Sequence, residues 1–233
     1  MMFIGGIQKS SLIDYPGKIC CVFFLSGCNF DCPYCHNANL VKGGLDSPEV
    51  LAVHSAFDFL GHRKGFLEGV VISGGEPTLQ KDLSSFCEGI KNLGYSVKLD
   101  TNGSRPEELK TLIDHGLVDY VAMDIKTDPL HYDPIIHKDQ QTDDLLSSIR
   151  TIMESAPDYE FRTTCVKGIV DEIVIQTIAK TIKGAKRYVL QPFQNKDVLH
   201  PEFFQDTDSH FNEDELSPLK TIAEPWVLEC IVR

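Results

Sequence analysis

Short apolar runs alternate with longer amphipathic stretches along most of this chain of 233 residues, and that alternation limits the folds open to it. Six apolar runs have the length of a β-strand, and five of them lead into a segment with helical periodicity. Repeated strand–helix units predict a parallel sheet with right-handed crossovers. Six units are fewer than the eight that close a barrel, so we expect an α/β fold with an open, partial barrel. The predicted strands cover residues 20–25, 70–73, 96–99, 118–123, 159–166 and 186–190.

The predicted helices have recognisable end signals. Ser47 is a suitable N-cap for a helix over residues 48–60, and a glycine directly follows three of the later helices. The later helices are predicted over residues 79–93, 105–115, 142–155 and 172–183.

The chain extends beyond these repeated units at both ends. Residues 1–18 predict an edge strand or a hairpin, and residues 214–223 and 226–232 predict a last helix and a final strand. We expect a single domain over residues 1–233, with a core at about 19–193 and a C-terminal extension at about 194–233 that caps the barrel.

Three cysteines follow the first predicted strand with the spacing C-x3-C-x2-C: Cys28, Cys32 and Cys35. An iron–sulfur cube held by three thiolates has one iron without a protein ligand, and that iron can bind a substrate or cosubstrate. The alternative is a structural zinc ion, whose fourth ligand would come from a histidine such as His36 or from a distant cysteine. The other five cysteines form no second cluster, so we expect one metal centre. They are Cys20, Cys21, Cys87, Cys165 and Cys230.

Net charge and hydropathy argue against two classes of partner, nucleic acids and membranes. The formal net charge is −12 and there is no run of lysine and arginine, which argues against nucleic-acid binding. No apolar stretch reaches membrane-spanning length, and the N-terminus lacks the pattern of a signal peptide. We therefore expect a cytoplasmic protein without a membrane anchor.

Several short motifs together carry a family resemblance. The cysteine motif, with an aromatic residue before its third cysteine, resembles the signature of the radical S-adenosylmethionine (radical SAM) enzymes. The surrounding motifs resemble those of the glycyl-radical activating enzymes. The strongest resemblance is to the activating proteins of anaerobic ribonucleoside-triphosphate reductase, and pyruvate formate-lyase activating enzyme is a related enzyme. These motifs are Asp14-Tyr15-Pro16-Gly17, Cys32-Pro33-Tyr34-Cys35-His36-Asn37, Gly74-Gly75-Glu76-Pro77-Thr78, Asp100-Thr101-Asn102-Gly103, Asp124-Ile125-Lys126 and Gln191-Pro192-Phe193.

The resemblance implies a fold, an activity and its partners. The fold would be a partial (βα)6 TIM-like barrel of the radical SAM type. Cys28, Cys32 and Cys35 would hold one 4Fe-4S cluster, whose free iron binds S-adenosylmethionine. Reductive cleavage would yield a 5′-deoxyadenosyl radical, which takes a hydrogen atom from a glycine of a large partner enzyme. The partner would be the anaerobic ribonucleotide reductase, and a flavodoxin or ferredoxin would donate the electron.

Three alternatives remain open at this point. The chain could activate another glycyl-radical enzyme of the pyruvate formate-lyase type. It could act on a small molecule, as a deazapurine synthase does. It could also be a zinc-stabilised binding module without enzymatic activity.

The resemblance also implies roles for individual residues. Tyr34 would lie near the adenine, and Gly74 and Gly75 would let the backbone approach the methionine amino group. Glu76 would support that group or the loop. His36 would tune the cluster through hydrogen bonds or simply pack in the loop.

The remaining predicted cofactor contacts come from the later strands. Asp100 and Thr101 would contact the ribose or methionine part of the cosubstrate, and Asp124 with Lys126 would lie beside the methionine carboxylate. In pyruvate formate-lyase activators that carboxylate and these aspartates can also hold a monovalent cation. Arg162 would pair with a carboxylate or lie on the outer face of its strand. Gln191 occupies the last strand, where those activators have a histidine-bearing motif.

The electron donor needs a docking face on an acidic protein. Flavodoxins and ferredoxins are themselves acidic, so a net charge of −12 opposes the encounter. We expect a local positive patch near the cluster formed by Lys9, Lys18 and Lys42.

Overall fold

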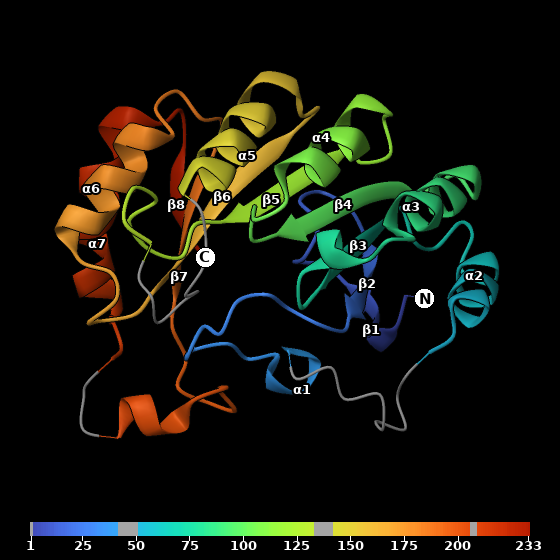
Figure 1. Ribbon diagram of the computed structural model, residues 1–233, viewed down its shortest axis with the longest axis horizontal. Coiled ribbons are helices and arrows are strands. Elements are labelled where there is room, and N and C mark those ends of the chain that lie inside the picture. The colour runs from blue at the N-terminus through green and yellow to red at the C-terminus, as the bar shows by residue number, and fades with distance from the viewer. Residues whose placement is uncertain (1, 42–50, 133–141, 206–208) are drawn as a thin grey trace.

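One sheet of eight strands organises the structure, a computed structural model that describes residues 2–41, 51–132, 142–205 and 209–233 (Figure 1). The strands lie side by side in chain order. Each pair from β2 to β8 is parallel, and β1 runs antiparallel to β2 along one edge. The strands are β1 (Ile4–Ser11), β2 (Cys20–Leu25), β3 (Gly69–Gly74), β4 (Ser96–Thr101), β5 (Tyr120–Asp124), β6 (Tyr159–Cys165), β7 (Tyr188–Pro192) and β8 (Cys230–Val232).

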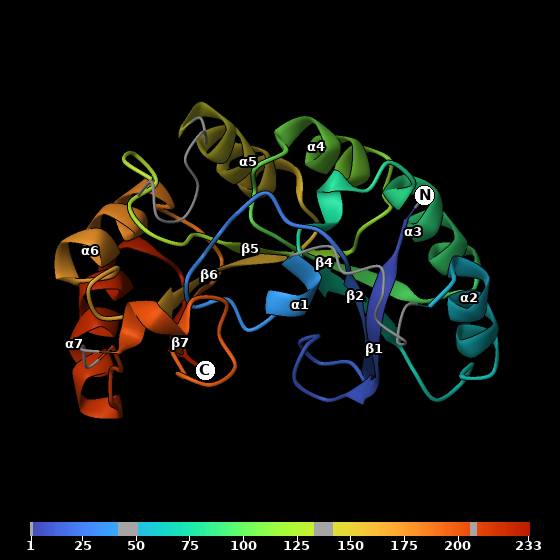
Figure 2. The ribbon, with the colours of Figure 1, turned by 60° about the horizontal axis from the view of Figure 1, so that its bottom comes forward.

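Helices α2 to α7 cover the convex side of this sheet as an arch, whereas α1 and the loop before it lie on the opposite side (Figure 2). The α-helices are α1 (Ala38–Val41), α2 (Val53–Gly61), α3 (Leu83–Asn92), α4 (Pro106–Asp114), α5 (Thr142–Ser155), α6 (Glu172–Thr181) and α7 (Glu213–Ala223). Three short 3-10 helices are η1 (Pro77–Leu79), η2 (Pro201–Phe204) and η3 (Glu224–Trp226). Within the described ranges, no helix is long and apolar enough to cross a membrane.

The predicted α/β fold with an open barrel is confirmed. The six predicted strands correspond to β2 through β7, and the predicted edge strand is β1. The C-terminal extension does more than cap the barrel, because its strand β8 pairs in parallel with β7 and continues the sheet. In the described part of the chain β1 and β8 are the two outer strands and do not pair with each other.

Two predicted helices begin later than expected. Leu51 forms a β-bridge with Ile4 and Ala52 is the N-cap, so α2 begins at Val53; Ser47 and residues 48–50 lie outside the described residues. The helix predicted over residues 79–93 begins only at Leu83, as α3, and Leu79 instead ends the separate turn η1. The late start has a local cause, since the Glu76 side chain caps the short η1 turn through the Thr78 amide.

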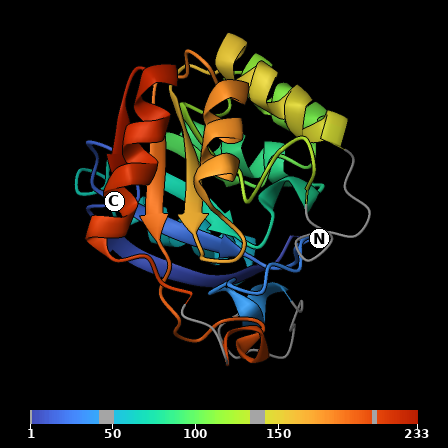
Figure 3. The same ribbon diagram turned by 90° about the vertical axis from the view of Figure 1, so that its left-hand side faces the viewer.

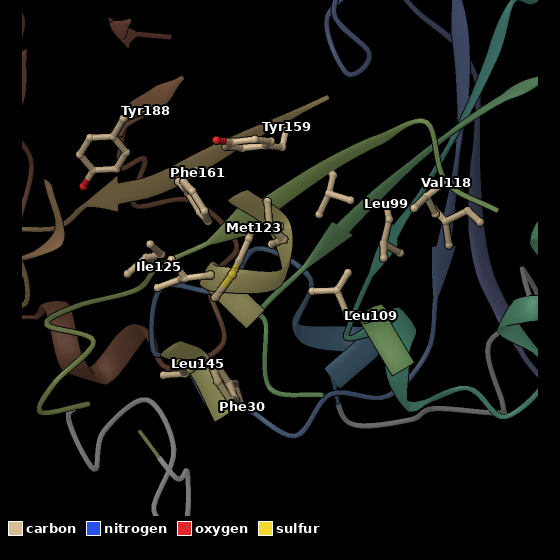
Figure 4. Packing of buried hydrophobic residues seen from close by; sticks show 14 of the residues in the cluster. Phe30, Leu99, Leu109, Val118, Met123, Ile125, Leu145, Tyr159, Phe161 and Tyr188 are labelled. Atoms are coloured by element: carbon tan, nitrogen blue, oxygen red, sulfur yellow. The ribbon is translucent and has the colours of Figure 1, made fainter. Parts of the chain in front are cut away.

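The two faces of the sheet differ in chemistry because side chains alternate along each strand. The face under the helices is apolar, and Leu99, Met123 and Phe161 from three neighbouring strands pack there against helix residues such as Leu109 (Figure 4). The concave face has a small apolar cluster that includes Tyr15 and Tyr120, and it also carries charged residues of β4, β5 and β6. A closed barrel fills this space with branched apolar side chains, whereas this open sheet leaves room for a polar site.

Candidate functional site

The three cysteines and the carboxyl ends of five strands, β3 to β7, surround one cavity of about 250 Å³. The loop that carries the cysteines follows β2, so parallel packing brings it over the ends of the neighbouring strands. Cys32 is buried, and Cys28 and Cys35 are partly exposed. All but one of the predicted cofactor-binding residues line this cavity: Tyr34, Gly74, Gly75, Asp100, Thr101, Asp124, Lys126, Arg162 and Gln191.

Side-chain amides attach the cysteine loop to the ends of β3 and β4. The Asn29 amide donates to the Ser104 hydroxyl at 2.9 Å, and its oxygen accepts from the Asn102 amide at 3.0 Å. Asn37 donates to the carbonyl oxygen of Gly74 at 2.9 Å. The amide N–H of Phe30 lies 3.4 Å from the Cys28 sulfur. Hydrogen bonds of this kind orient metal ligands and tune their electron density.

Gly74 and Gly75 are required by contacts within the protein itself. Gly74 has a φ of 117°, and a Cβ there would collide with the backbone of Leu25. A Cβ at Gly75 would collide with the carbonyl of Gly27, next to Cys28. Without side chains, the end of β3 can lie directly against the start of the cysteine loop. Both glycines also line the cavity, so the predicted close approach of a ligand remains compatible with this packing.

Glu76 is the predicted cofactor-binding residue that does not line the cavity. Its side chain is fully buried, and its carboxylate accepts hydrogen bonds from Thr78 and Thr101 and, at 2.6 Å, from the Asn102 amide N–H. Burial raises the pKa of Glu76, and the donors from Asn102 and Thr78 oppose that rise. Glu76 therefore supports the loops, one of the two roles predicted for it, by joining the ends of β3 and β4.

Five charged side chains form a continuous network beside the cavity, which we call the charged network: Lys98, Asp100, Asp124, Lys126 and Arg162. The Arg162 Nε donates to Asp124 at 2.7 Å, and its Nη1 lies 3.4 Å from Asp100. Lys126 donates to Asp124 at 2.9 Å, and Lys98 lies 2.5 Å from Asp100. Arg162 thus faces the concave side of β6, and the alternative placement on its outer face is wrong.

The network keeps its carboxylates ionised despite their burial. Burial alone would raise the pKa of Asp124, but Arg162 and Lys126 outweigh it and hold that pKa well below its usual range. The pKa of Asp100 is lowered in the same way, with burial opposed by Arg162 and Lys98. Burial lowers the pKa of Lys126, yet Asp124 raises it by more. All three groups are therefore charged at neutral pH.

The hydroxyl of Tyr34 has no hydrogen-bond partner although it is buried. Among the described residues it is the one buried side-chain polar atom in this situation. An unsatisfied buried hydroxyl costs about 1–3 kcal/mol, so such atoms usually mark the place of a missing partner. Other atoms of Tyr34 line the cavity.

The donor set fits an iron–sulfur cluster better than one zinc ion. Among the described residues, no three His, Cys, Asp or Glu side chains are arranged to hold a single metal ion. A four-iron cluster has a separate iron for each thiolate, so its ligands need not converge on one point. Burial raises the pKa of the Cys28 thiol to about 11 and that of Cys32 to about 12, so metal binding must displace their protons.

The C-terminal extension lies against the cysteine loop, and Figure 3 shows η2 beside α1 below the sheet. The His36 Nε2 donates to the carbonyl oxygen of Gln194 at 2.7 Å. The His200 backbone N–H donates to the carbonyl of Pro33 at 3.1 Å. Phe193 packs between the His36 and His210 rings. His36 therefore holds the loop against the extension, a contact that sequence reasoning did not identify.

Sequence reasoning also missed Lys98 and placed two lysines of the expected positive patch wrongly. Lys98 was assigned only to a strand, although strict alternation with Asp100 puts both on the same face. Lys9 and Lys18 do not lie near the cysteine loop. Residues Gln8 and Ser11 pair with the first half of β2, and Lys18 precedes that strand, whereas the loop follows its far end. Lys42 lies outside the described residues.

Comparisons with known proteins agree with this geometry. A family model described as the radical SAM superfamily matches residues 22–180. A Methanocaldococcus jannaschii protein, provisionally named a glycyl-radical enzyme activating enzyme, is 37% identical over 99% of this chain and 95% of its own length. A pyruvate formate-lyase-activating enzyme of Streptococcus mutans is 26% identical over 82% of this chain and 76% of that enzyme.

Solved structures show the same fold. SuiB of Streptococcus suis matches with a TM-score of 0.66 at 13% identity, covering 89% of this chain and 47% of SuiB, so this chain spans about half of that protein. Methylornithine synthase matches with a TM-score of 0.62 at 12% identity, covering 91% of this chain and 70% of that protein. Together with the family model, which matches most of the sequence, these findings establish that the chain belongs to the radical SAM superfamily.

Proposed function

We propose that this enzyme is a radical SAM activase that generates a glycyl radical on a large partner enzyme, the anaerobic ribonucleoside-triphosphate reductase. Membership of the superfamily implies a 4Fe-4S cluster and S-adenosylmethionine. The observation that carries the proposal is the shared cavity, which is lined by the three cysteines, by Tyr34 and by four members of the charged network. The relative that matches 99% of this chain is named for glycyl-radical activation, which supports the reaction class.

The predicted cofactor-binding residues that line the cavity would have distinct roles in this reaction. Cys28, Cys32 and Cys35 would hold the cluster, which when bound supplies the electron that breaks the C5′–S bond of S-adenosylmethionine. Lys126, which lines the cavity, would bind the methionine carboxylate. Tyr34 would lie near the adenine of the cosubstrate. Asp100, Thr101 and Gln191 would orient the ribose so that its 5′ carbon points to the substrate.

A protein substrate also needs an entrance to the cavity. The sheet is open between its outer strands, and a second hollow of about 550 Å³ lies beside the cysteine loop and shares His36 and Asn37 with the first cavity. Gly5 and Gly6 of β1 also line this hollow. The space beside Gly5 is filled by Leu40 and Ser26, whereas a Cβ at Gly6 would make only ordinary contacts with Phe24. An extended loop of a partner could therefore reach the 5′ carbon from the side of β1.

The test is electron paramagnetic resonance on an anaerobic mixture of reduced enzyme, S-adenosylmethionine and the reductase. We expect the doublet of a glycyl radical, which disappears when the reductase glycine is replaced by Ala or when the enzyme carries Cys32→Ala. A doublet on pyruvate formate-lyase but not on the reductase would change the partner and keep the reaction. No glycyl signal with any glycyl-radical enzyme, while S-adenosylmethionine is still cleaved, would overturn the proposal.

A second candidate has one observation in its favour. A 7-carboxy-7-deazaguanine synthase of Hyperthermus butylicus is 39% identical over 83 residues, although these cover only 35% of this chain. Such an enzyme binds a small heterocycle inside the barrel. Stoichiometric binding of a pterin or deazapurine by the isolated holoenzyme, together with its turnover, would favour this alternative over activation of a protein.

A further inference from the structure

Lys98 is the most deeply buried member of the charged network, with 1% of its side chain exposed. It extends from the middle of β4 on the same face as Asp100 and does not line the cavity itself. Its ammonium group lies 2.5 Å from Asp100 Oδ1 and 5.9 Å from the centre of the Tyr120 ring. A lysine is seldom buried to this degree unless its ammonium group is paired or has a function.

The net charge of the charged network disfavours the binding of an additional cation. Three basic side chains face two acidic ones, so the formal sum is +1. Asp100 has Lys98 and Arg162 as partners, and Asp124 has Arg162 and Lys126. A metal cation bound between the two aspartates would stand next to three positive groups in a buried environment. Two carboxylates at adjacent strand ends would otherwise be a suitable oxygen-donor site for a monovalent cation.

We propose that the Lys98 ammonium group is a built-in cation that takes the place of a bound monovalent metal ion at Asp100, so that the site binds S-adenosylmethionine without Na⁺ or K⁺. This inference rests on the proposed function of the cavity. Lys98 acts through Asp100, which lines the cavity, and is therefore a positioning residue. Its charge holds the Asp100 carboxylate in place and completes the net positive surroundings that a methionine carboxylate requires.

The experiment measures S-adenosylmethionine binding to the cluster-containing protein by calorimetry under anaerobic conditions. Choline, Na⁺ or K⁺ is the only monovalent cation in each buffer, at equal ionic strength. The unaltered protein should have the same dissociation constant in all three buffers. Lys98→Met keeps the unbranched stem and removes the charge, so its dissociation constant should rise about tenfold in choline, because Asp100 loses its nearest buried partner. Na⁺ or K⁺ should restore most of that loss by occupying the vacated position.

Three variants serve as controls. Lys98→Arg keeps the positive charge and should remain independent of the cation. The double variant Lys98→Met with Asp100→Asn removes both charges and should also lose the cation dependence. Lys91→Met breaks a Lys–Asp pair of similar length, 2.6 Å to Asp119, on the surface of α3, and should behave as the unaltered protein. If Lys98→Met does not fold, Lys98→Gln repeats the series.

A second measurement separates this inference from the proposed function. Thermal unfolding of the cluster-containing protein without S-adenosylmethionine should give a midpoint that rises in Na⁺ or K⁺ for Lys98→Met, and no such rise for the unaltered protein. Cation dependence of the unaltered protein would overturn the inference, and so would a Lys98→Met protein that responds equally to all three cations. If no form of the protein binds S-adenosylmethionine, the proposed function fails and the unfolding series alone decides the role of Lys98.

Discussion

His200 of the C-terminal extension lies 3.0 Å from the carboxylate of Asp31, which stands between Cys28 and Cys32 in the cysteine loop. The other imidazole nitrogen lies 2.9 Å from Glu202. Two segments separated by about 170 positions in the sequence are thereby joined. The conformation of the cysteine loop therefore depends on the extension as well as on the strand that precedes it.

This contact should weaken as the pH rises. Hydrogen bonds to Asp31 and then to Glu202 raise the pKa of His200 above its usual value of about 6.5. A raised histidine pKa means that the contact contributes fully below about pH 6.5 and is lost as the pH rises through the higher value of the folded state. We expect faster amide hydrogen exchange over residues 194–204 at pH 8.5 than at pH 6, after correction for intrinsic rates. His200→Gln should remove the difference, and equal protection of the unaltered protein at both pH values would contradict the prediction.

The cysteines should fall into two groups. Replacing Cys28, Cys32 or Cys35 by Ala should abolish S-adenosylmethionine cleavage and lower the iron content, which we expect to be about four irons per chain in the unaltered protein. Cys87→Ala is a matched control, because Cys87 is fully buried in α3 and packs against other apolar side chains. It should keep its iron while losing stability. Iron loss from a folded Cys87→Ala protein would mean that a ligand has been misassigned.

Glu76→Gln should separate loop support from cofactor binding. The Glu76 carboxylate accepts hydrogen bonds from Thr78, Thr101 and Asn102. A glutamine side chain has the same shape, but its NH2 group would face one of these hydrogen-bond donors and could not accept from it. We expect a loss of about 1–3 kcal/mol in the free energy of unfolding. Urea titration measures this loss, and Glu88→Gln on the exposed side of α3 is the control. Unchanged stability with weaker S-adenosylmethionine binding would instead place Glu76 in contact with the cosubstrate.

Arg162→Lys should weaken cosubstrate binding although it keeps the charge. The guanidinium group reaches both Asp100 and Asp124, and a lysine ammonium group cannot span two carboxylates in this fixed geometry. We expect the dissociation constant of S-adenosylmethionine to rise at least about tenfold, since one charged hydrogen bond contributes roughly 1.5–3 kcal/mol. Arg187→Lys, at an exposed pair with Glu229, should have little effect. Equal affinities in the two variants would show that the bridge does not order the site.

Much of the fold and of the cavity could be predicted from the sequence. Hydrophobic periodicity located β2 through β7, because a strand buried under helices needs a continuous apolar run. The polar residues after those strands met at one edge, since parallel strands point the same way. The periodicity did not predict where α3 begins. The Glu76 side chain caps the separate turn η1 just before this helix, and such local hydrogen bonds leave no periodic pattern.

The sequence by itself determined the cysteine spacing, the strands and the polar strand ends, because each is a local property of a few consecutive residues. Only the tertiary structure determined which charged side chains from different segments form pairs. Arg162 bridges to Asp100 and Asp124, and His200 reaches Asp31, because neighbouring strands and the C-terminal extension pack in one particular arrangement. The pair of Lys98 and Asp100, in contrast, lies within β4 and follows from alternation along one strand. Alternation along a strand tells which face a side chain occupies, but its partner across the sheet depends on crossovers that bring distant residues together.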